Sequence, residues 1–313
     1  MRALRIVYFG TPDFAVPGLR ALIESPHEVA GLVSQPDRPR GRGQKHHPTP
    51  TKLIAEAAGI PVLQPMRLKE DAFADALGSL SPDLGVVAAY GRIIPDRILE
   101  IPRLGMINIH ASLLPKYRGA APVHRAVING DTATGVTIMR VVSELDAGPM
   151  FASRRVAIGP DQTTPEVERT LAATGAALVV EVVAQLAGGT AVEVPQNHQD
   201  ATYAAKVERS EGAIDWSQPA FRIHNLVRGL QPWPLVSASF DGVRCLVHRT
   251  SVTGEHTTAP PGTVATASGG VLAVAGGDGR VLRILEIQPE GKRVMPARDL
   301  LAGRHIRPGT RVT

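Results

Sequence analysis

The stretch Arg5-Ile6-Val7-Tyr8-Phe9-Gly10 is an apolar run that ends at a glycine, and a helical pattern follows at 13–24. A second apolar run at 28–34 leads into a long polar loop, after which helix resumes at 51–58. Apolar strands that alternate with helices are typical of a parallel sheet covered on both faces. The N-terminal part therefore predicts an α/β fold of the Rossmann-like kind.

The alternation continues to about residue 186 and then changes. Further strands are predicted at 84–90, 106–110, 134–142 and 151–158, and a long helix from Thr163 or Thr164 to Leu186. A polar stretch with no apolar period follows, which is typical of a linker. Beyond it we predict one helix at 218–230 and five short strands, at 236–240, 243–250, 262–266, 270–275 and 281–286.

Five short strands between glycine and proline turns predict a small β-barrel of the oligonucleotide-binding (OB-like) type, although a β-sandwich fits nearly as well. The expected division is a catalytic α/β domain at 1–189, a linker at 190–206 and a barrel domain at 207–313.

Composition excludes several classes of protein. Hydrophobic residues make up 43% of the 313 residues and charged residues 20%, which argues against disorder. The single cysteine, Cys245, cannot form an internal disulfide, so we expect a cytoplasmic protein. The apolar stretch 176–187 contains Glu181 and Gln185 and is shorter than the roughly 20 residues that cross a bilayer, so we expect no membrane span.

The net charge of +5 lies entirely in the C-terminal third. Residues 1–205 hold 20 basic and 20 acidic side chains, whereas residues 206–313 hold 14 basic and 9 acidic. Clustered Lys and Arg gain affinity by displacing counterions from phosphates, so this part favours a polyanionic partner. A basic surface that only aids solubility is equally common for so small an excess.

The polar loop after residue 34 is itself basic. Between Arg38 and Lys52 there are five basic residues, two histidines and no acid, and the glycines and prolines there predict neither helix nor strand. Such surface loops often carry binding residues. The segment lacks the third glycine of a dinucleotide fingerprint, which disfavours an NAD-dependent oxidoreductase.

Two segments carry candidate catalytic residues. Asn108 and His110 lie two apart on a predicted strand, so their side chains point to the same face at the edge where open α/β sheets bind ligands. An amide can donate to a developing oxyanion, and an imidazole can accept or carry a proton. Asp146 lies in a turn between two predicted strands, where by itself it is more typical of a residue that stabilises the turn.

Taken together, these segments resemble the methionyl-tRNA formyltransferase family from about residue 4 to about residue 301. The matching stretches are 10–15 (GTPDFA), 35–39 (QPDRP) with 41–43 (GRG), 112–115 (SLLP) with 118–122 (RGAAP), 134–139 (TGVTIM), 145–148 (LDAG) and 232–234 (PWP). The stretches 112–115 and 118–122 resemble the formyltetrahydrofolate signature, which is shared with formyltransferases of other acceptors. The two basic regions favour tRNA as the acceptor.

The resemblance implies transfer of a formyl group from 10-formyltetrahydrofolate to the α-amino group of methionine on initiator tRNA, by a monomer that needs no metal. It implies a catalytic trio of Asn108, His110 and Asp146. It assigns folate binding to Ser112, Leu113, Leu114 and Pro115, with Tyr90 and Ile93 in the pterin pocket wall. It assigns tRNA binding to Arg38, Arg40, Arg42, Lys45 and Lys206.

Two alternatives stay open at the level of sequence. One is a folate-dependent formyltransferase that acts on a small amine, such as a sugar nucleotide or glycinamide ribonucleotide. The other is an RNA-binding relative without activity, which the presence of all three candidate catalytic residues argues against.

Overall fold

The computed structural model describes residues 2–40 and 45–313, which form two compact units. The first unit comprises Met1–Pro122, Thr134–Ala157 and Glu168–Ala204. The second comprises Val123–Ala133, Ile158–Val167 and Ala205–Thr313. Each unit is described by itself.

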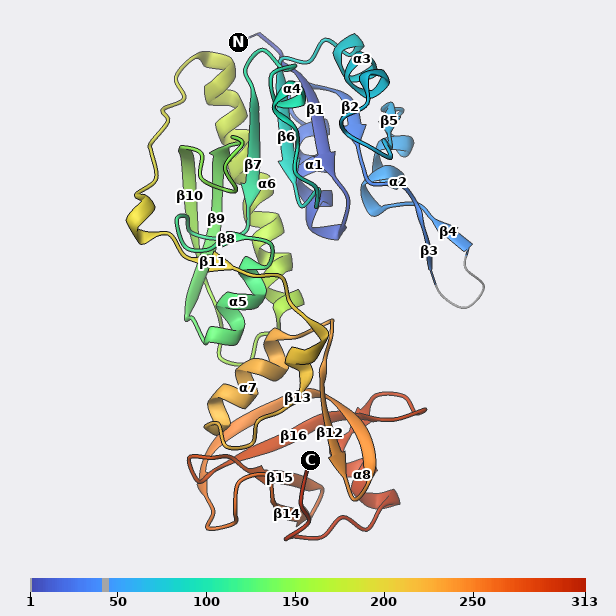
Figure 1. Cartoon of the computed structure of the whole chain (residues 1–313), viewed down its shortest axis with the longest axis vertical. Helices are drawn as coiled ribbons and strands as arrows, with labels where there is room; N and C mark the ends of the chain where they lie inside the picture. The colour runs from blue at the N-terminus through green and yellow to red at the C-terminus, as the bar shows by residue number, and fades with distance from the viewer. Residues whose placement is uncertain (1, 41–44) are drawn as a thin grey trace. The chain divides into compact units, whose positions relative to one another are not determined.

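The first unit is built on a seven-stranded sheet in the order β10-β9-β7-β6-β1-β2-β5 (Figure 1). Its strands are β1 (Arg5–Gly10), β2 (Glu28–Val33), β5 (Val62–Leu63), β6 (Leu84–Ala88), β7 (Met106–His110), β9 (Ala133–Arg140) and β10 (Met150–Ala157). The pairs β5·β2, β2·β1, β1·β6 and β6·β7 are parallel, and β9 is antiparallel to β7. The predicted mostly parallel sheet is confirmed.

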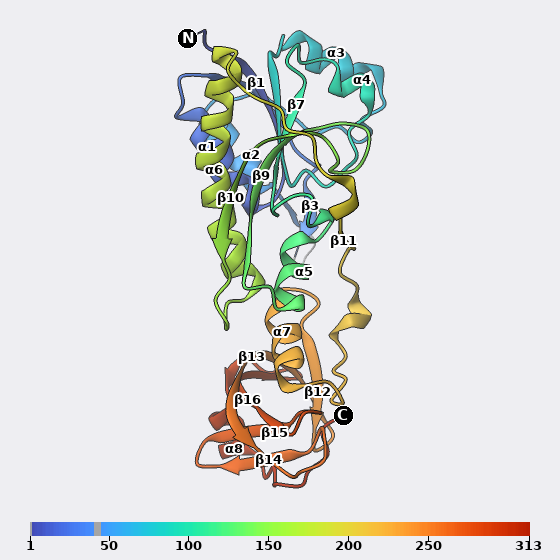
Figure 2. The same cartoon turned by 90° about the vertical axis from the view of Figure 1, so that its left-hand side faces the viewer.

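Helices cover both faces of this sheet (Figure 2). They are α1 (Val16–Ile23), α2 (Pro50–Ala57), α3 (Asp71–Ser79), α4 (Asp96–Leu99) and α6 (Thr164–Gly188), with a short η1 (Asp13–Ala15) before α1. Alternate residues of β1 pack on opposite faces: a Cβ at Gly18 of α1 would meet the Tyr8 hydroxyl, whereas Val7 and Phe9 pack with Phe73 of α3. Burial on both faces explains the nearly continuous apolar runs of the central strands.

The helix α6 coincides with the predicted helix from Thr163 or Thr164 to Leu186 and ends two residues later, at Gly188. Its 25 residues are long and apolar enough to cross a membrane by length and composition alone. The helix nevertheless packs on the sheet, because a Cβ at Gly175 would lie 2.7 Å from Ile109 Cγ2 of β7. Its apolar side chains, among them Leu171, Val179 and Val182, are buried in the protein. We conclude that α6 is a core helix.

The basic segment is not the irregular loop that its glycines and prolines predict. Arg38–Arg40 (β3) pairs antiparallel with Lys45–His47 (β4), in a hairpin that extends from the sheet near α2 (Figure 1). The prediction of no strand is therefore wrong for these six residues. Pro39 is tolerated because each strand of a two-stranded ribbon has one unpaired edge, where a missing N–H costs nothing.

The second unit is a closed, mainly antiparallel β-structure. Its strands are β12 (Val236–Phe240), β13 (Val243–His256), β14 (Val264–Ser268), β15 (Val271–Ala275), β16 (Arg280–Pro289) and β17 (Met295–Pro296), in the order β12-β13-β16-β15-β14 with β17 beside β16. The C-terminal residues link the two ends of this order, because the Ser239 N–H donates to Thr313 O and the Val264 N–H to Thr310 O. The predicted OB-like barrel is confirmed.

The helices of this unit are α5 (Pro122–Asn129), α7 (Ala220–Gly229), α8 (Ala297–Gly303) and η3 (Arg209–Gly212). The first turn of α6 also belongs to it, with a capping box in which Glu166 Oε2 accepts from the N–H of Thr163 at 2.7 Å. Glu166 Oε1 accepts from Arg249 at 2.6 Å. These donors, the Thr163 N–H first, lower the pKa of Glu166 from its usual value of 4.5 to about 2.

The predicted linker contacts the first unit in the structure. Tyr203–Ala204 (β11) pairs in parallel with Arg118–Gly119 (β8), and the short η2 (His198–Asp200) precedes it. Residues 202–204 thus pair with the loop that follows β7, and Gln196 accepts a hydrogen bond from Arg118 of the same loop. The domain limits of 1–189, 190–206 and 207–313 stay a prediction.

Candidate active site

Asn108 and His110 lie at the carboxyl end of β7, where β1, β6 and β7 end at the same edge of the sheet. Ile109 between them faces α6, so the two polar side chains share the opposite face. His110 is buried and Asn108 is half-buried. Within the described part of the chain, the side-chain amide of Asn108 forms no hydrogen bond with another residue. Its N–H groups are therefore available to a ligand.

The imidazole of His110 is oriented by the main chain. Its Nε2 lies 2.7 Å from the carbonyl oxygen of Tyr117, which also accepts from the Ser112 hydroxyl at 2.8 Å. A carbonyl oxygen can only accept, so Nε2 carries a proton. In the neutral ring, Nδ1 is then the nitrogen with a free lone pair, and it is the only ring atom that can take up a further proton.

Asp146 brings a carboxylate to that same nitrogen. Its Oδ1 lies 3.8 Å from His110 Nδ1, and its Oδ2 accepts from the Gly119 N–H at 2.8 Å. The distance to Nδ1 is too long for a direct hydrogen bond, so Asp146 acts on the ring through its charge. The structure thus brings together His110 and Asp146, which are 36 residues apart in the chain.

The conformation of the Asp146 turn requires the glycine that follows. Asp146 itself has a φ of 49°, in the left-handed region that aspartate and asparagine tolerate better than most residues. A Cβ at Gly148 would lie 2.0 Å from the carbonyl oxygen of Arg140. The turn therefore packs directly on the end of β9, and only glycine fits at position 148.

The predicted folate residues of the 112–115 stretch are mostly buried. The Ser112 side chain is fully buried and bonded to Tyr117, and Leu114 is buried too. Thr137 of β9 holds this loop, since its hydroxyl donates to Ser112 O at 2.7 Å and accepts from the Leu114 N–H at 3.2 Å. Ser112 and His110 therefore share the Tyr117 carbonyl oxygen as a partner, and half-buried Leu113 and Pro115 are more open to a ligand. The assignment of 112–115 to folate binding stays a prediction.

Tyr90 and Ile93, the other predicted folate residues, follow β6, which is paired with β7 as expected. The Tyr90 ring is only 2% exposed and packs edge-on against Phe9, with centroids 5.4 Å apart. The ring is therefore buried beside Phe9, and its place in a pterin pocket wall stays a prediction. Ile93 is 84% exposed and is free to contact one.

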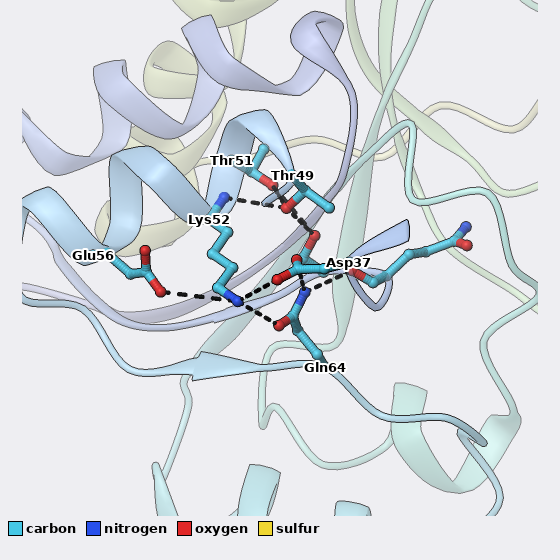
Figure 3. A network of polar contacts seen from close by, with 8 residues as sticks. Asp37, Thr49, Thr51, Lys52, Glu56 and Gln64 are labelled. Carbon is cyan, nitrogen blue, oxygen red and sulfur yellow. Dashed lines mark hydrogen bonds and ion pairs between the residues drawn. The ribbon is translucent and has the colours of Figure 1, made fainter. Parts of the chain in front are cut away.

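The base of the β3–β4 hairpin is held by a polar network (Figure 3). Lys52 Nζ donates to Asp37 at 2.7 Å and to the Gln64 side chain at 3.0 Å, and Gln64 donates back to Asp37 at 2.8 Å. On the other leg, the Thr49 hydroxyl contacts Ser34 and accepts from the Lys52 N–H. Residues before β3 and after β4 are thus tied to α2.

Lys52 faces two carboxylates in this network, Asp37 at 2.7 Å and Glu56 at 4.0 Å. Partial burial by itself would raise the pKa of Asp37, but hydrogen bonds from Lys52 and Gln64 outweigh it and the pKa is lowered. The hydrogen bond that Lys52 donates to Asp37 raises the pKa of Lys52, which therefore stays protonated.

Of the predicted tRNA-binding residues, Arg38 and Arg40 lie on β3 and Lys45 on β4, in the register Arg38↔His47 and Arg40↔Lys45. Arg38 is exposed and donates to Gln35. Arg42 lies outside the described residues. Lys206 is exposed in the second unit, where its carbonyl oxygen accepts from Arg125.

Gln196 and Arg118 contact the Asp146 turn but were not among the predicted site residues. The Gln196 amide donates to the carbonyl oxygens of Asp146 and Gly148, and Arg118 donates to Gln196 Oε1. Gln196 is 50 residues from Asp146 in a polar stretch without period, so no local signal marks it. Residues 2–40 and 45–313 contain no group of three His, Cys, Asp or Glu side chains that could hold a metal ion.

A Rossmann-like sheet with an amide, an imidazole and a carboxylate at its carboxyl edge, joined to a small barrel, is the architecture of a formyl-transferring enzyme. The chain belongs to the formyl transferase family: residues 4–183 match the family described as Formyl transferase, and residues 206–305 match its C-terminal domain. The resemblance noted in the sequence and the assignment as an enzyme are thereby confirmed.

Several similar curated proteins are named methionyl-tRNA formyltransferase. The chain is 44% identical to methionyl-tRNA formyltransferase of Moorella thermoacetica, over 98% of each chain. It is 46% identical to that of Methylococcus capsulatus, over 95% of this chain and 96% of the relative. It is 44% identical to that of Geobacter metallireducens, over 100% and 99%.

Solved structures share the fold at lower identity. An N-formyltransferase from Helicobacter canadensis superposes with a TM-score of 0.70 at 17% identity, over 91% of this chain and 99% of that chain. A glycinamide ribonucleotide transformylase from Symbiobacterium toebii gives a TM-score of 0.51 at 22% identity, over 62% of this chain and 95% of that one. These likenesses concern the fold alone.

Proposed function

We propose that this chain transfers the formyl group of 10-formyltetrahydrofolate to the α-amino group of methionyl initiator tRNA. The observation that carries the proposal is the approach of Asp146 Oδ1 to His110 Nδ1 at 3.8 Å, near Asn108, whose side-chain amide has no hydrogen-bond partner among the described residues. The names of relatives that are 44–46% identical over nearly the whole chain support the acceptor.

The reaction needs one group that stabilises the formyl oxygen and another that transfers a proton from the amine to the leaving nitrogen. A bond forms between the amine nitrogen and the formyl carbon, the bond from that carbon to the folate nitrogen breaks, and one proton passes from the amine to the departing nitrogen. Asn108 donates to the formyl oxygen as negative charge develops there. His110 Nδ1 takes the proton from the amine and returns it to the departing nitrogen. The charge of Asp146 stabilises the ring while it carries that proton.

Acceptor binding is assigned to the two basic regions. Arg38, Arg40 and Lys45 on the hairpin strands, together with Arg42 from the same stretch of sequence, are proposed to contact the acceptor stem. Lys206 and the basic second unit are proposed to contact the backbone farther along the stem. Phosphate contacts of this kind supply affinity and position but do not read sequence.

The direct test incubates the full chain with 10-formyltetrahydrofolate and initiator tRNA, either charged with methionine or uncharged, and measures formylmethionine after release from the tRNA. Product with charged tRNA alone supports the proposal. Product that persists after nuclease digestion of the tRNA, or equal formylation of a small amine, would replace it with the small-amine alternative. The Asn108→Ala variant should lower turnover about a hundredfold, whereas the exposed neighbour of Gln196, Asn197→Ala, should not.

A further inference from the structure

The turn that carries Asp146 is held by a residue from the segment between α6 and the second unit. Gln196 is 5% exposed, and its side-chain Nε2 donates to the carbonyl oxygens of both Asp146 and Gly148 at 2.8 Å. One amide group thus bridges the two ends of a three-residue turn. Because Asp146 has a φ of 49°, the turn needs such external support to stay in this conformation.

Gln196 is in turn fixed by a buried cation. Arg118 is 1% exposed, and its Nε and Nη2 donate to Gln196 Oε1 at 3.1 and 2.9 Å. A guanidinium donates only, so it forces the Gln196 oxygen toward Arg118 and the Gln196 NH₂ toward the turn. The orientation of the amide is therefore set by its partner.

Arg118 also contacts the same turn directly. Its Nη1 lies 3.4 Å from Glu144 Oε1, and the next residue in the chain, Gly119, donates its N–H to the Asp146 carboxylate. Residues 118, 119 and 196 thus bind the turn at 144–148 through Glu144, Asp146 and Gly148. None of these side chains needs to touch a substrate to influence the reaction.

We propose that Gln196, oriented by Arg118, is a positioning residue that holds the Asp146 carboxylate at its distance from His110 Nδ1. The inference rests on the proposed function, since it concerns the proton that His110 carries there. It assigns the segment after α6 to the active site, through a Gln196 side chain that contacts the main chain of the turn and Arg118.

The expected effect follows from the geometry. Gln196→Met keeps the length of the side chain but removes both donors to the turn and the acceptor for Arg118. A displacement of about 1 Å in a catalytic group can cost about a hundredfold in rate. We expect kcat to fall about 10- to 100-fold, with the KM for both substrates nearly unchanged. Gln199→Ala, an exposed glutamine three residues on, is the matched control and should behave as wild type.

A double-mutant cycle separates positioning from a general loss of folding. If Gln196 acts through the carboxylate, Gln196→Met should lower kcat strongly in the wild-type chain but hardly further in an Asp146→Asn background. Multiplicative losses in the cycle, a kcat for Gln196→Met equal to that of Gln199→Ala, or a loss matched by the unfolded fraction in thermal melting would overturn the inference. Failure of the proposed function is distinct, because the wild-type chain would then give no formylmethionine.

Discussion

Replacement of Asp146 by asparagine tests how the carboxylate acts on His110. Asparagine has the same shape, tolerates the φ of 49° and can still accept from the Gly119 N–H with its oxygen. That contact directs its NH₂ group toward His110 Nδ1, where the wild-type chain has a negative oxygen at 3.8 Å. The variant removes the charge and offers a donor to the one free lone pair of the ring.

The magnitude follows from Coulomb's law. Two unit charges 3.8 Å apart interact by about 4 kcal/mol in an effective dielectric of about 20, and this stabilisation is present only while the ring carries a proton. A loss of that size at the transition state corresponds to about a 10³-fold lower kcat. Because the carboxylate touches no substrate in this scheme, KM for folate and for tRNA should stay within a few-fold.

The assay is steady-state formylation of methionyl-tRNA with each substrate varied in turn, together with thermal melting. Asp241→Asn is the matched control, because Asp241 also has a φ of 49° and is exposed in the β12–β13 turn of the other unit. A kcat within tenfold of wild type for Asp146→Asn would refute the electrostatic role. A rise in KM without a change in kcat would instead assign Asp146 to substrate binding.

Three other substitutions test separate parts of the structure. Gly148→Ala should lower both kcat and melting temperature, because its Cβ would lie 2.0 Å from a backbone oxygen, whereas Gly254→Ala has open space and should be neutral in both measurements. Asp37→Ala should loosen the hairpin base and so raise the KM for tRNA but not the KM for folate. The loss of a negative charge by itself would lower the KM for tRNA. A lowered KM for tRNA would therefore contradict the role of the network. Glu166→Gln should lower the free energy of unfolding in urea by about 2 kcal/mol at pH 7. The pKa of Glu166 is lower in the folded state, so the difference in free energy of unfolding should shrink as pH falls from about 4.5 toward 2. A difference that is constant over that range would contradict the stabilising role of the Glu166 charge.

The strands of the first unit could be predicted because burial on both faces leaves an unmistakable apolar run. The run at 5–10 and the strand at 106–110 coincide with β1 and β7, and the alternation of β7 placed Asn108 and His110 on one face. The β3–β4 hairpin was missed because a two-stranded ribbon buries no side-chain face, so its sequence carries polar and turn-forming residues like any loop.

The candidate site was only partly predictable. The motif at 112–115 marks a stretch important to the site but does not tell which side chains face inward, and Ser112 proved to be buried against Tyr117. Gln196 could not be found at all, since its contacts join segments 50 residues apart and depend on where the chain returns after α6. β13 runs on to His256, beyond the predicted end at residue 250, because shifts in its register with β16 let one strand bend without breaking.

The pairing of β11 with β8 bears on how these two units could be separated or recombined. A chain that stops at Gly189 would retain every strand of the seven-stranded sheet, yet it would lack Gln196 and the β11 partner of Gly119. Cleavage by a protease between residues 190 and 204 should lower the activity for the same reason. Chimeras that join a different C-terminal module to this enzyme should therefore be joined after Ala204.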